Sequence, residues 1–175
     1  MTAPADPAGP IDPIAEARRQ WIEHGWTDAA DGMAALTAIM RVQQLLLARC
    51  DAALAPFELT FARFELLALL SFTRHGELPL GKAGVRLQVH PASITNAVGR
   101  LEAQGLVERV PHPTDGRGVL ARITPTGRRV VAKATTELNE VFRDLGVSDP
   151  EARRIVTLLG KVRSAAGDPV ARRFF

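Results

Sequence analysis

Residues 91–104 combine helix signals with a small, polar set of side chains. Proline is favoured in the first turn of a helix and glycine just past its end, and Pro91 and Gly105 occupy those places. At 100° per residue, Ile94, Val98 and Leu101 gather on one side, which we predict to be buried. The opposite side would let the helix backbone approach a DNA major groove closely. The residues predicted to contact DNA around this helix are His90, Ala92, Ser93, Thr95, Asn96 and Arg100.

These side chains have different expected roles. The Asn96 amide can pair bidentately with adenine, so it is the best candidate for reading a base. Ser93, Thr95 and Arg100 are better placed for phosphates. An ordinary surface helix with a neutral outer face is the alternative that this segment leaves open.

A hairpin is predicted after this helix. Residues 106–110 and 119–123 are short and β-like, and the segment between them is rich in proline and glycine. Arg117 at its tip can enter a narrow minor groove, where the potential is most negative, while Asp115 braces it. His112 and Arg122 are expected to add phosphate contacts. The alternative is an exposed salt bridge, which contributes little to stability.

The charge distribution agrees with a polyanionic partner for this region alone. Residues 78–129 carry eight basic and three acidic side chains, a net charge of +5. The rest of the chain is net −2, within a total of +3. A basic module on a slightly acidic body is typical of a protein that touches nucleic acid with one part.

Several further helices must position these residues. Helices are predicted over 13–24, from Asp28 or Asp31 to about 54, over 61–73 with Thr60 as cap, and within 78–87. Two more are predicted over 125–145 and 150–164. In the third helix, the side chains expected to face a core are Phe61, Phe64, Leu67, Ala68 and Leu70. The fold class is therefore mainly α with a small β-hairpin wing, a winged helix-turn-helix with helices on both sides.

Three motifs in order resemble the MarR family of bacterial regulators. They are Leu101-Glu102 with Gly105-Leu106 and Arg109, then Asp115-Gly116-Arg117, then Ile123-Thr124-Pro125-Thr126-Gly127. The resemblance covers roughly residues 33–144, with glycines where many members carry a second wing arginine. It implies a homodimer joined through its terminal helices, a palindromic double-stranded operator, and a pocket for a small molecule. We expect a repressor; a winged-helix dimer used for protein contacts is the alternative.

The expected organisation follows from these elements. It comprises a disordered lead-in (1–12), N-terminal helices for dimerisation and a ligand pocket (13–56), the winged helix-turn-helix lobe (57–124), C-terminal dimerisation helices (125–165) and a tail (166–175). The terminal helices carry more apolar residues than one lobe of this size can cover, which favours two symmetric subunits.

Aromatic residues near the N-terminus suggest an effector site. The candidates for binding a small aromatic or lipophilic effector are Trp21, His24, Trp26, Arg41, Phe64 and Arg109. A simple helix-packing cluster is the alternative. An N-terminal helix with a tryptophan is similar to the urate-responsive branch of the family, yet Glu65 and Ala97 stand where Asp and Arg are expected. Loss of that arginine argues against urate.

The single cysteine and the overall composition exclude other classes. Cys50 permits no internal disulfide or Cys-rich zinc site, and its place on an apolar helix stripe favours an inert thiol over a redox sensor. No apolar run has the length of a membrane span, and the N-terminus lacks the basic start of a signal peptide. We therefore expect a cytoplasmic protein without enzyme activity, metal or cofactor.

Overall fold

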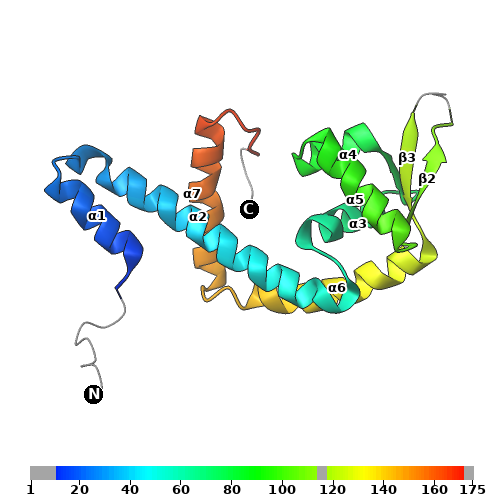
Figure 1. Cartoon of the computed structure of the whole chain (residues 1–175), viewed down its shortest axis with the longest axis horizontal. Coiled ribbons are helices and arrows are strands. Elements are labelled where there is room, and N and C mark those ends of the chain that lie inside the picture. The colour runs from blue at the N-terminus through cyan, green and yellow to red at the C-terminus, as the bar shows by residue number, and fades with distance from the viewer. Residues whose placement is uncertain (1–10, 114–117, 172–175) are drawn as a thin grey trace, which may run out of the picture.

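The computed structural model describes residues 11–113 and 118–171. In Figure 1, α2 and α6 form a long arm, a lobe lies at one end of it, α1 packs on the far end of α2, and α7 projects from the arm. The elements in chain order are α1 (Pro13–Glu23), α2 (Thr27–Leu54), a 3-10 turn (Ala55–Phe57), α3 (Phe61–Phe72), β1 (Glu77–Pro79), α4 (Leu80–Leu87), α5 (Pro91–Ala103), β2 (Val107–Pro111), β3 (Val119–Ile123), α6 (Pro125–Arg143) and α7 (Asp149–Ala165).

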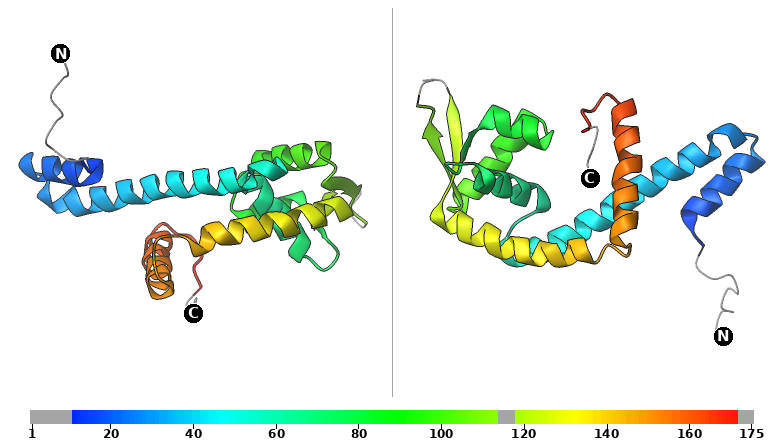
Figure 2. Two further views of the ribbon diagram at one scale, coloured as in Figure 1. Left: turned by 90° about the horizontal axis from the view of Figure 1, so that it is seen from below. Right: turned by 180° about the vertical axis from the view of Figure 1, so that it is seen from behind.

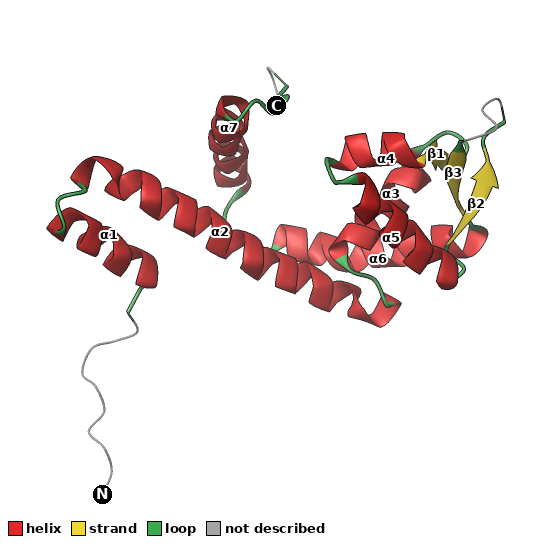
Figure 3. Ribbon diagram, turned by 45° about the horizontal axis from the view of Figure 1, so that its top comes forward, coloured by secondary structure: helices red, strands yellow, loops and turns green. Residues whose placement is uncertain are grey.

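The lobe is a winged helix-turn-helix, as expected from the sequence. Helices α4 and α5 make its two-helix unit, and β2 and β3 pair antiparallel, with Val107 opposite Ile123 and Arg109 opposite Ala121. Figure 3 shows the small sheet at the edge of the helical lobe. Strand β1, which extends the sheet to the order β1-β3-β2, was not predicted. Three residues are too few to show a period, and Leu78 becomes a strand residue only because Ala121 lies opposite it.

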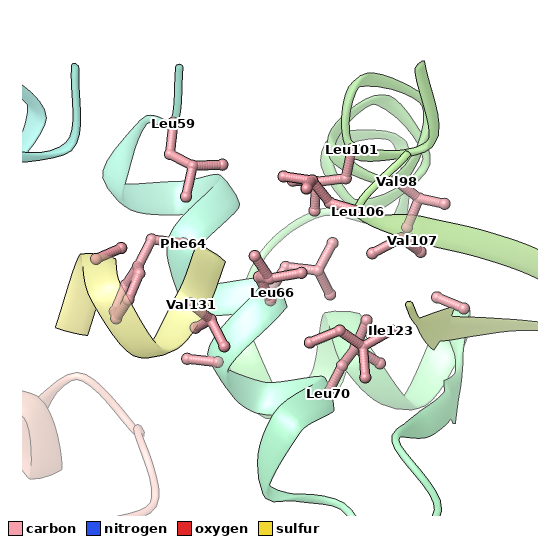
Figure 4. Close-up of a cluster of buried hydrophobic side chains, with 14 of the residues drawn as sticks. Leu59, Phe64, Leu66, Leu70, Val98, Leu101, Leu106, Val107, Ile123 and Val131 are labelled. Atoms are coloured by element: carbon pink, nitrogen blue, oxygen red, sulfur yellow. The ribbon is translucent and has the colours of Figure 1, made fainter. Parts of the chain in front are cut away.

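One apolar core holds the lobe together (Figure 4). Leu66, Leu67 and Leu70 of α3 are fully buried against Val98 and Leu101 of α5. The predicted inner face of α5 is thereby confirmed, including Ile94. In α3 the prediction is confirmed: Phe64, Leu67, Ala68 and Leu70 are buried, and Phe61 is half-buried and packs against the same core. Phe61 is the first residue of its helix and also lines a groove beside α2 and α6.

Helix α6 joins the lobe to the arm. Val131, Ala134 and Leu138 are buried in the lobe core and pack along α3. The same helix then continues beside α2, where the Arg49 guanidinium donates to the Asp144 carboxylate at 2.7 Å. The lobe therefore has a continuous helical connection to the arm rather than a linker.

Three helix starts differ from the expected caps. Neither Asp28 nor Asp31 caps α2; Trp26 is its N-cap, because a turn at Gly25 brings the Trp26 N–H to the Trp21 carbonyl. Thr60 stands at the N-cap of α3, yet the side chain that accepts from the Phe61 N–H, at 2.7 Å, is Asp51 of α2. Asp12, placed in the lead-in, caps α1 by accepting from the Ile14 N–H. Sequence spacing does not show caps that come from another helix.

Two searches of the described part of the chain were negative. None of the helices within 11–113 and 118–171 is long and apolar enough to cross a membrane. Within the same ranges, no three His, Cys, Asp or Glu side chains cluster in a way that could hold a metal ion.

Candidate nucleic-acid interface

The outer face of α5 is open to solvent. Ala92, Ser93, Thr95 and Asn96 are all exposed, while the opposite side of the helix is sealed into the core. This helix can therefore present its small polar face to a partner without disturbing the packing of the lobe. These residues were expected to share one face, and the structure brings them together.

His90 acts first as a helix cap. It is the N-cap of α5, and its Nδ1 accepts a hydrogen bond from the Ala92 N–H at 3.2 Å. A ring nitrogen that accepts must be unprotonated, so this geometry leaves Nε2 as the outward-facing donor. His90 thus fixes the start of the candidate DNA-reading helix and offers one N–H beside it.

The Thr95 hydroxyl already donates a hydrogen bond within its own helix. The Thr95 Oγ1 donates to the Pro91 carbonyl one turn earlier, at 3.1 Å. In this rotamer the oxygen can accept but not donate, and a phosphate offers no proton at neutral pH. The geometry therefore suits Thr95 to an amino group on a base edge better than to the phosphate expected from the sequence.

Arg100 shares a groove with Arg63, a residue that no sequence pattern indicated. The groove has a volume of about 500 Å³ and lies between the start of α3 and the outer side of α5. Arg63 enters it from α3 with its Nε 3.2 Å from the Thr60 hydroxyl, and Arg100 enters it from α5. The two guanidinium groups make the groove attractive to an anion. Arg63 carries no motif of its own, and only the packing of α3 beside α5 reveals it.

Arg122 is engaged at the base of the wing. Its Nε donates to Glu77 at 2.7 Å and its Nη1 lies 3.5 Å from Glu108. The bond to Glu77 is the main cause of the raised pKa of Arg122. Its predicted phosphate contact would require breaking these ion pairs, so the structure favours a role in joining the three strands. The predicted tip residues Asp115 and Arg117 lie outside the described residues.

Arg109 braces α5 from the wing. Its guanidinium pairs with Glu102 and donates to the Thr95 carbonyl at 3.3 Å. The side chain also passes close to Gly99, where an added Cβ would make an ordinary van der Waals contact with Nη2 at 3.7 Å. Arg109 was expected in an effector pocket, but here its guanidinium holds the candidate DNA-reading helix.

The other predicted effector residues are far apart within one chain. Trp21 packs edge-on against Trp26 at 5.4 Å, and the His24 ring stacks on Trp26 at 5.5 Å. This cluster lies at the end of α2 that is away from the lobe. Phe64, by contrast, is buried in the core of the lobe. A helix of this length spans roughly 40 Å, and Arg41 is exposed along it. The predicted common pocket is therefore not formed by a single chain.

An apolar groove runs instead between α2, α6 and α7. It has a volume of about 740 Å³, and its lining includes Val42, Leu46, Cys50, Phe61 and Phe142. Cys50 is buried at its edge, and this burial is the main cause of the raised pKa of its thiol. A thiol with a raised pKa is a poor nucleophile, which disfavours the redox-sensor alternative.

A two-helix unit with an exposed small polar face, next to an antiparallel hairpin, defines a winged-helix protein. A family model described as MarR family matches residues 57–118. Sco5413, a MarR family transcriptional regulator from Streptomyces coelicolor, is 48% identical over 81% of this chain and 99% of that chain, with a TM-score of 0.72. The chain belongs to the MarR family of transcriptional regulators, which are not enzymes.

Two further similarities are more limited. The HTH-type transcriptional regulator Mb0904 of Mycobacterium bovis is 36% identical over 70 residues, which make up 40% of this chain and 49% of that protein. The chain thus spans about half the length of the curated relatives it matches. Sco3205 from Streptomyces coelicolor, solved in complex with DNA, is 20% identical over 81% of this chain and 90% of that chain, with a TM-score of 0.70. At that identity the likeness concerns the fold alone.

Proposed function

We propose that this protein is a sequence-specific double-stranded DNA-binding repressor that acts as a homodimer on a palindromic operator. The observation that carries the proposal is the exposed small polar face of α5, opposite a fully buried face. The DNA complex of Sco3205 supports the idea that this lobe docks on duplex DNA. A dimer seated on an operator would exclude RNA polymerase, and binding to the chromosome would place the protein in the cytoplasm.

The contacts divide into base reading and phosphate binding. Asn96 and Thr95 face outward from the middle of α5 and are assigned to base edges. Arg100 and Arg63 are assigned to phosphates because their guanidinium groups carry positive charge, and Ser93 because its hydroxyl lies in the same groove beside α5, which Asn96 also lines. The wing residues Asp115 and Arg117 are assigned to the minor groove on the sequence argument alone.

Homodimerisation is proposed because the arm exposes a large apolar surface. Leu36 and Met40 of α2 are 61% and 56% exposed, and Leu158 and Val162 of α7 are 60% and 58% exposed. Monomers rarely leave contiguous apolar surface of this kind in water. A second copy would cover it and place the two α5 helices about one DNA turn apart. The helices of 13–56 and 125–165 are the proposed dimerisation elements.

A small effector, if it is aromatic or lipophilic, is assigned to the apolar groove beside Cys50. This groove touches both the arm and the lobe, through Phe142 and Phe61. A ligand in this groove would therefore change the angle between the arm and the lobe. A ligand at the aromatic cluster of Trp21 could not, because that cluster lies at the far end of α2.

Replacing Asn96 by alanine should relax specificity at one base pair of each half-site. Without the bidentate pairing of the amide with adenine, operator binding is expected to weaken by roughly 10- to 100-fold, with binding to random duplex unchanged. The measurement is competition binding against an operator selected from random sequence and its single-base variants. An equal weakening on operator and random duplex would remove Asn96 from base reading.

Replacing Arg100 by alanine should weaken binding to every duplex. Removing one phosphate-binding side chain should reduce the slope of log K against log salt by about 1 per subunit. The matched control is Arg153→Ala, because Arg153 is exposed on α7, on the side of that helix opposite Leu158 and Val162. If the two variants have the same salt slope, the groove of Arg100 and Arg63 does not contact DNA.

A further inference from the structure

The segment that follows α7 folds back toward the lobe. The Gly167 backbone is left-handed, and the Asp168 N–H donates to the Arg163 carbonyl at 3.0 Å. Val170 then lies against Gly160, where an added Cβ would be 3.5 Å from its Cγ1. Figures 1 and 2 show this segment on the side of α7 that faces the lobe. The turn is therefore an ordered structure that holds the Asp168 side chain in one direction.

Asp168 joins two parts of the chain that are 80 residues apart. Its Oδ2 accepts from the Nε of Arg163 at 2.5 Å, and its Oδ1 accepts from the Nε2 of Gln88 at 2.6 Å. Arg163 also donates to the Pro169 carbonyl at 3.4 Å, so it ties the segment to α7 twice. The hydrogen bond from Arg163 is the main cause of the lowered pKa of Asp168, so this carboxylate stays ionised to a lower pH than an ordinary aspartate does.

Gln88 stands at the turn between the two helices of the helix-turn-helix. It is the C-cap of α4, and two residues later His90 caps α5. Its φ is 55°, a left-handed conformation that favours glycine or asparagine. A glycine would suit the backbone better but could not reach Asp168. The side chain therefore gives a reason for glutamine at this position.

This link has few alternatives. Among residues 11–113 and 118–171, no other hydrogen bond joins 149–171 to the lobe. Within the described residues, α7 has no extensive packing contact with any other helix or strand. Without the link, α7 would be connected to the lobe only through α6 and the short loop that follows it.

We propose that Gln88, Asp168 and Arg163 form a polar strap that positions the DNA-reading helix relative to α7, one of the proposed dimerisation helices. Asp168 and Gln88 are positioning residues, since they act through the α4–α5 turn. In the dimer, the strap sets the distance between the two α5 helices and so selects the half-site spacing of the operator. This inference rests on the proposed dimeric DNA binding.

The first test needs no DNA. Gln88→Met keeps the side-chain length but removes the donor, and Gln88→Lys keeps a donor for Asp168. Amide hydrogen exchange at residues 88–90, 92 and 166–168 should be about fivefold faster in Gln88→Met and unchanged in Gln88→Lys. The matched control is Lys82→Met, at an exposed α4 lysine whose side chain has no hydrogen bond within the described part of the chain. Equal exchange in Gln88→Met and Lys82→Met would overturn the strap.

The second test measures whether the strap positions the two α5 helices on the operator. Duplexes carry the palindrome selected from random sequence, with its half-sites at the selected spacing or one base pair closer or farther apart. Gln88→Met should lose about fivefold in its preference for the selected spacing while binding a single half-site as well as wild type does. Unchanged spacing preference would overturn the positioning role, even with faster exchange. If wild type selects no site at all, the proposed function fails, whereas the exchange result still decides whether the strap exists.

Discussion

An aspartate at Leu158, combined with one at Val162, should convert the protein to monomers and abolish tight operator binding. The two side chains are exposed in the single chain, on the apolar side of α7 that we assign to the partner subunit. A carboxylate buried without a partner costs several kcal/mol, and a twofold interface contains each substitution twice. We therefore expect the dimer dissociation constant to rise by about 100-fold or more. Sedimentation or light scattering over a dilution series measures it.

The control for this variant lies on the same helix. Arg153→Asp changes the charge by more than Leu158→Asp does, but on the opposite side of α7. It should leave the protein dimeric. If the Leu158 and Val162 double variant stays dimeric, this face of α7 is not the interface, and α2 and α1 would have to supply it. If it becomes monomeric yet binds the operator as before, the dimeric mode of recognition is wrong.

Gly127→Ala should destabilise the lobe by about 3 kcal/mol, near the upper end of what overpacking usually costs. A Cβ at this position would lie 2.2 Å from the Leu106 carbonyl oxygen and 2.9 Å from the Ile123 Cγ1. The backbone oxygen cannot rotate away, because it accepts from the Thr124 N–H at 3.0 Å. The added methyl would therefore push the start of α6 off the wing.

Gly81→Ala is the matched control for Gly127→Ala. Gly81 is also helical, yet an added Cβ would meet nothing within 4 Å. Alanine there should be neutral or stabilising by up to about 1 kcal/mol. Denaturant unfolding at one fixed protein concentration compares the variants with wild type, since dimerisation makes stability depend on concentration. Equal stability of the two variants would mean that α6 and the wing do not pack as closely as described.

The wing attachment also gives a physical reason for the motif at residues 123–127. Thr124 caps α6 by accepting from the Gly127 N–H at 3.0 Å, and its hydroxyl lies 2.8 Å from the Gly105 carbonyl. Threonine, proline and glycine at these positions thus form one junction, at which the start of α6 contacts the loop between α5 and β2. The spacing was visible in the sequence, but the reason for the glycine was not.

Local patterns determined most of the elements. The 3.6-residue period predicted the inner face of α5 correctly, and the prolines at 91 and 125 marked the starts of α5 and α6. Such signals depend on residues within one or two turns of the same helix, so they can be recognised without knowledge of the fold. The winged-helix class and the exposed face of α5 follow from them, together with the order of the elements.

Only the tertiary structure shows which side chains contact each other when they are far apart in the sequence. Arg63 beside Arg100, Asp51 at the start of α3, and Gln88 on Asp168 each join separate elements. Arg109 is a second example. An arginine can bind an anionic ligand or a carboxylate of the same chain, and only the structure shows that Arg109 pairs with Glu102. A side chain's partner is chosen by packing geometry, and local sequence periodicity carries no information about that geometry.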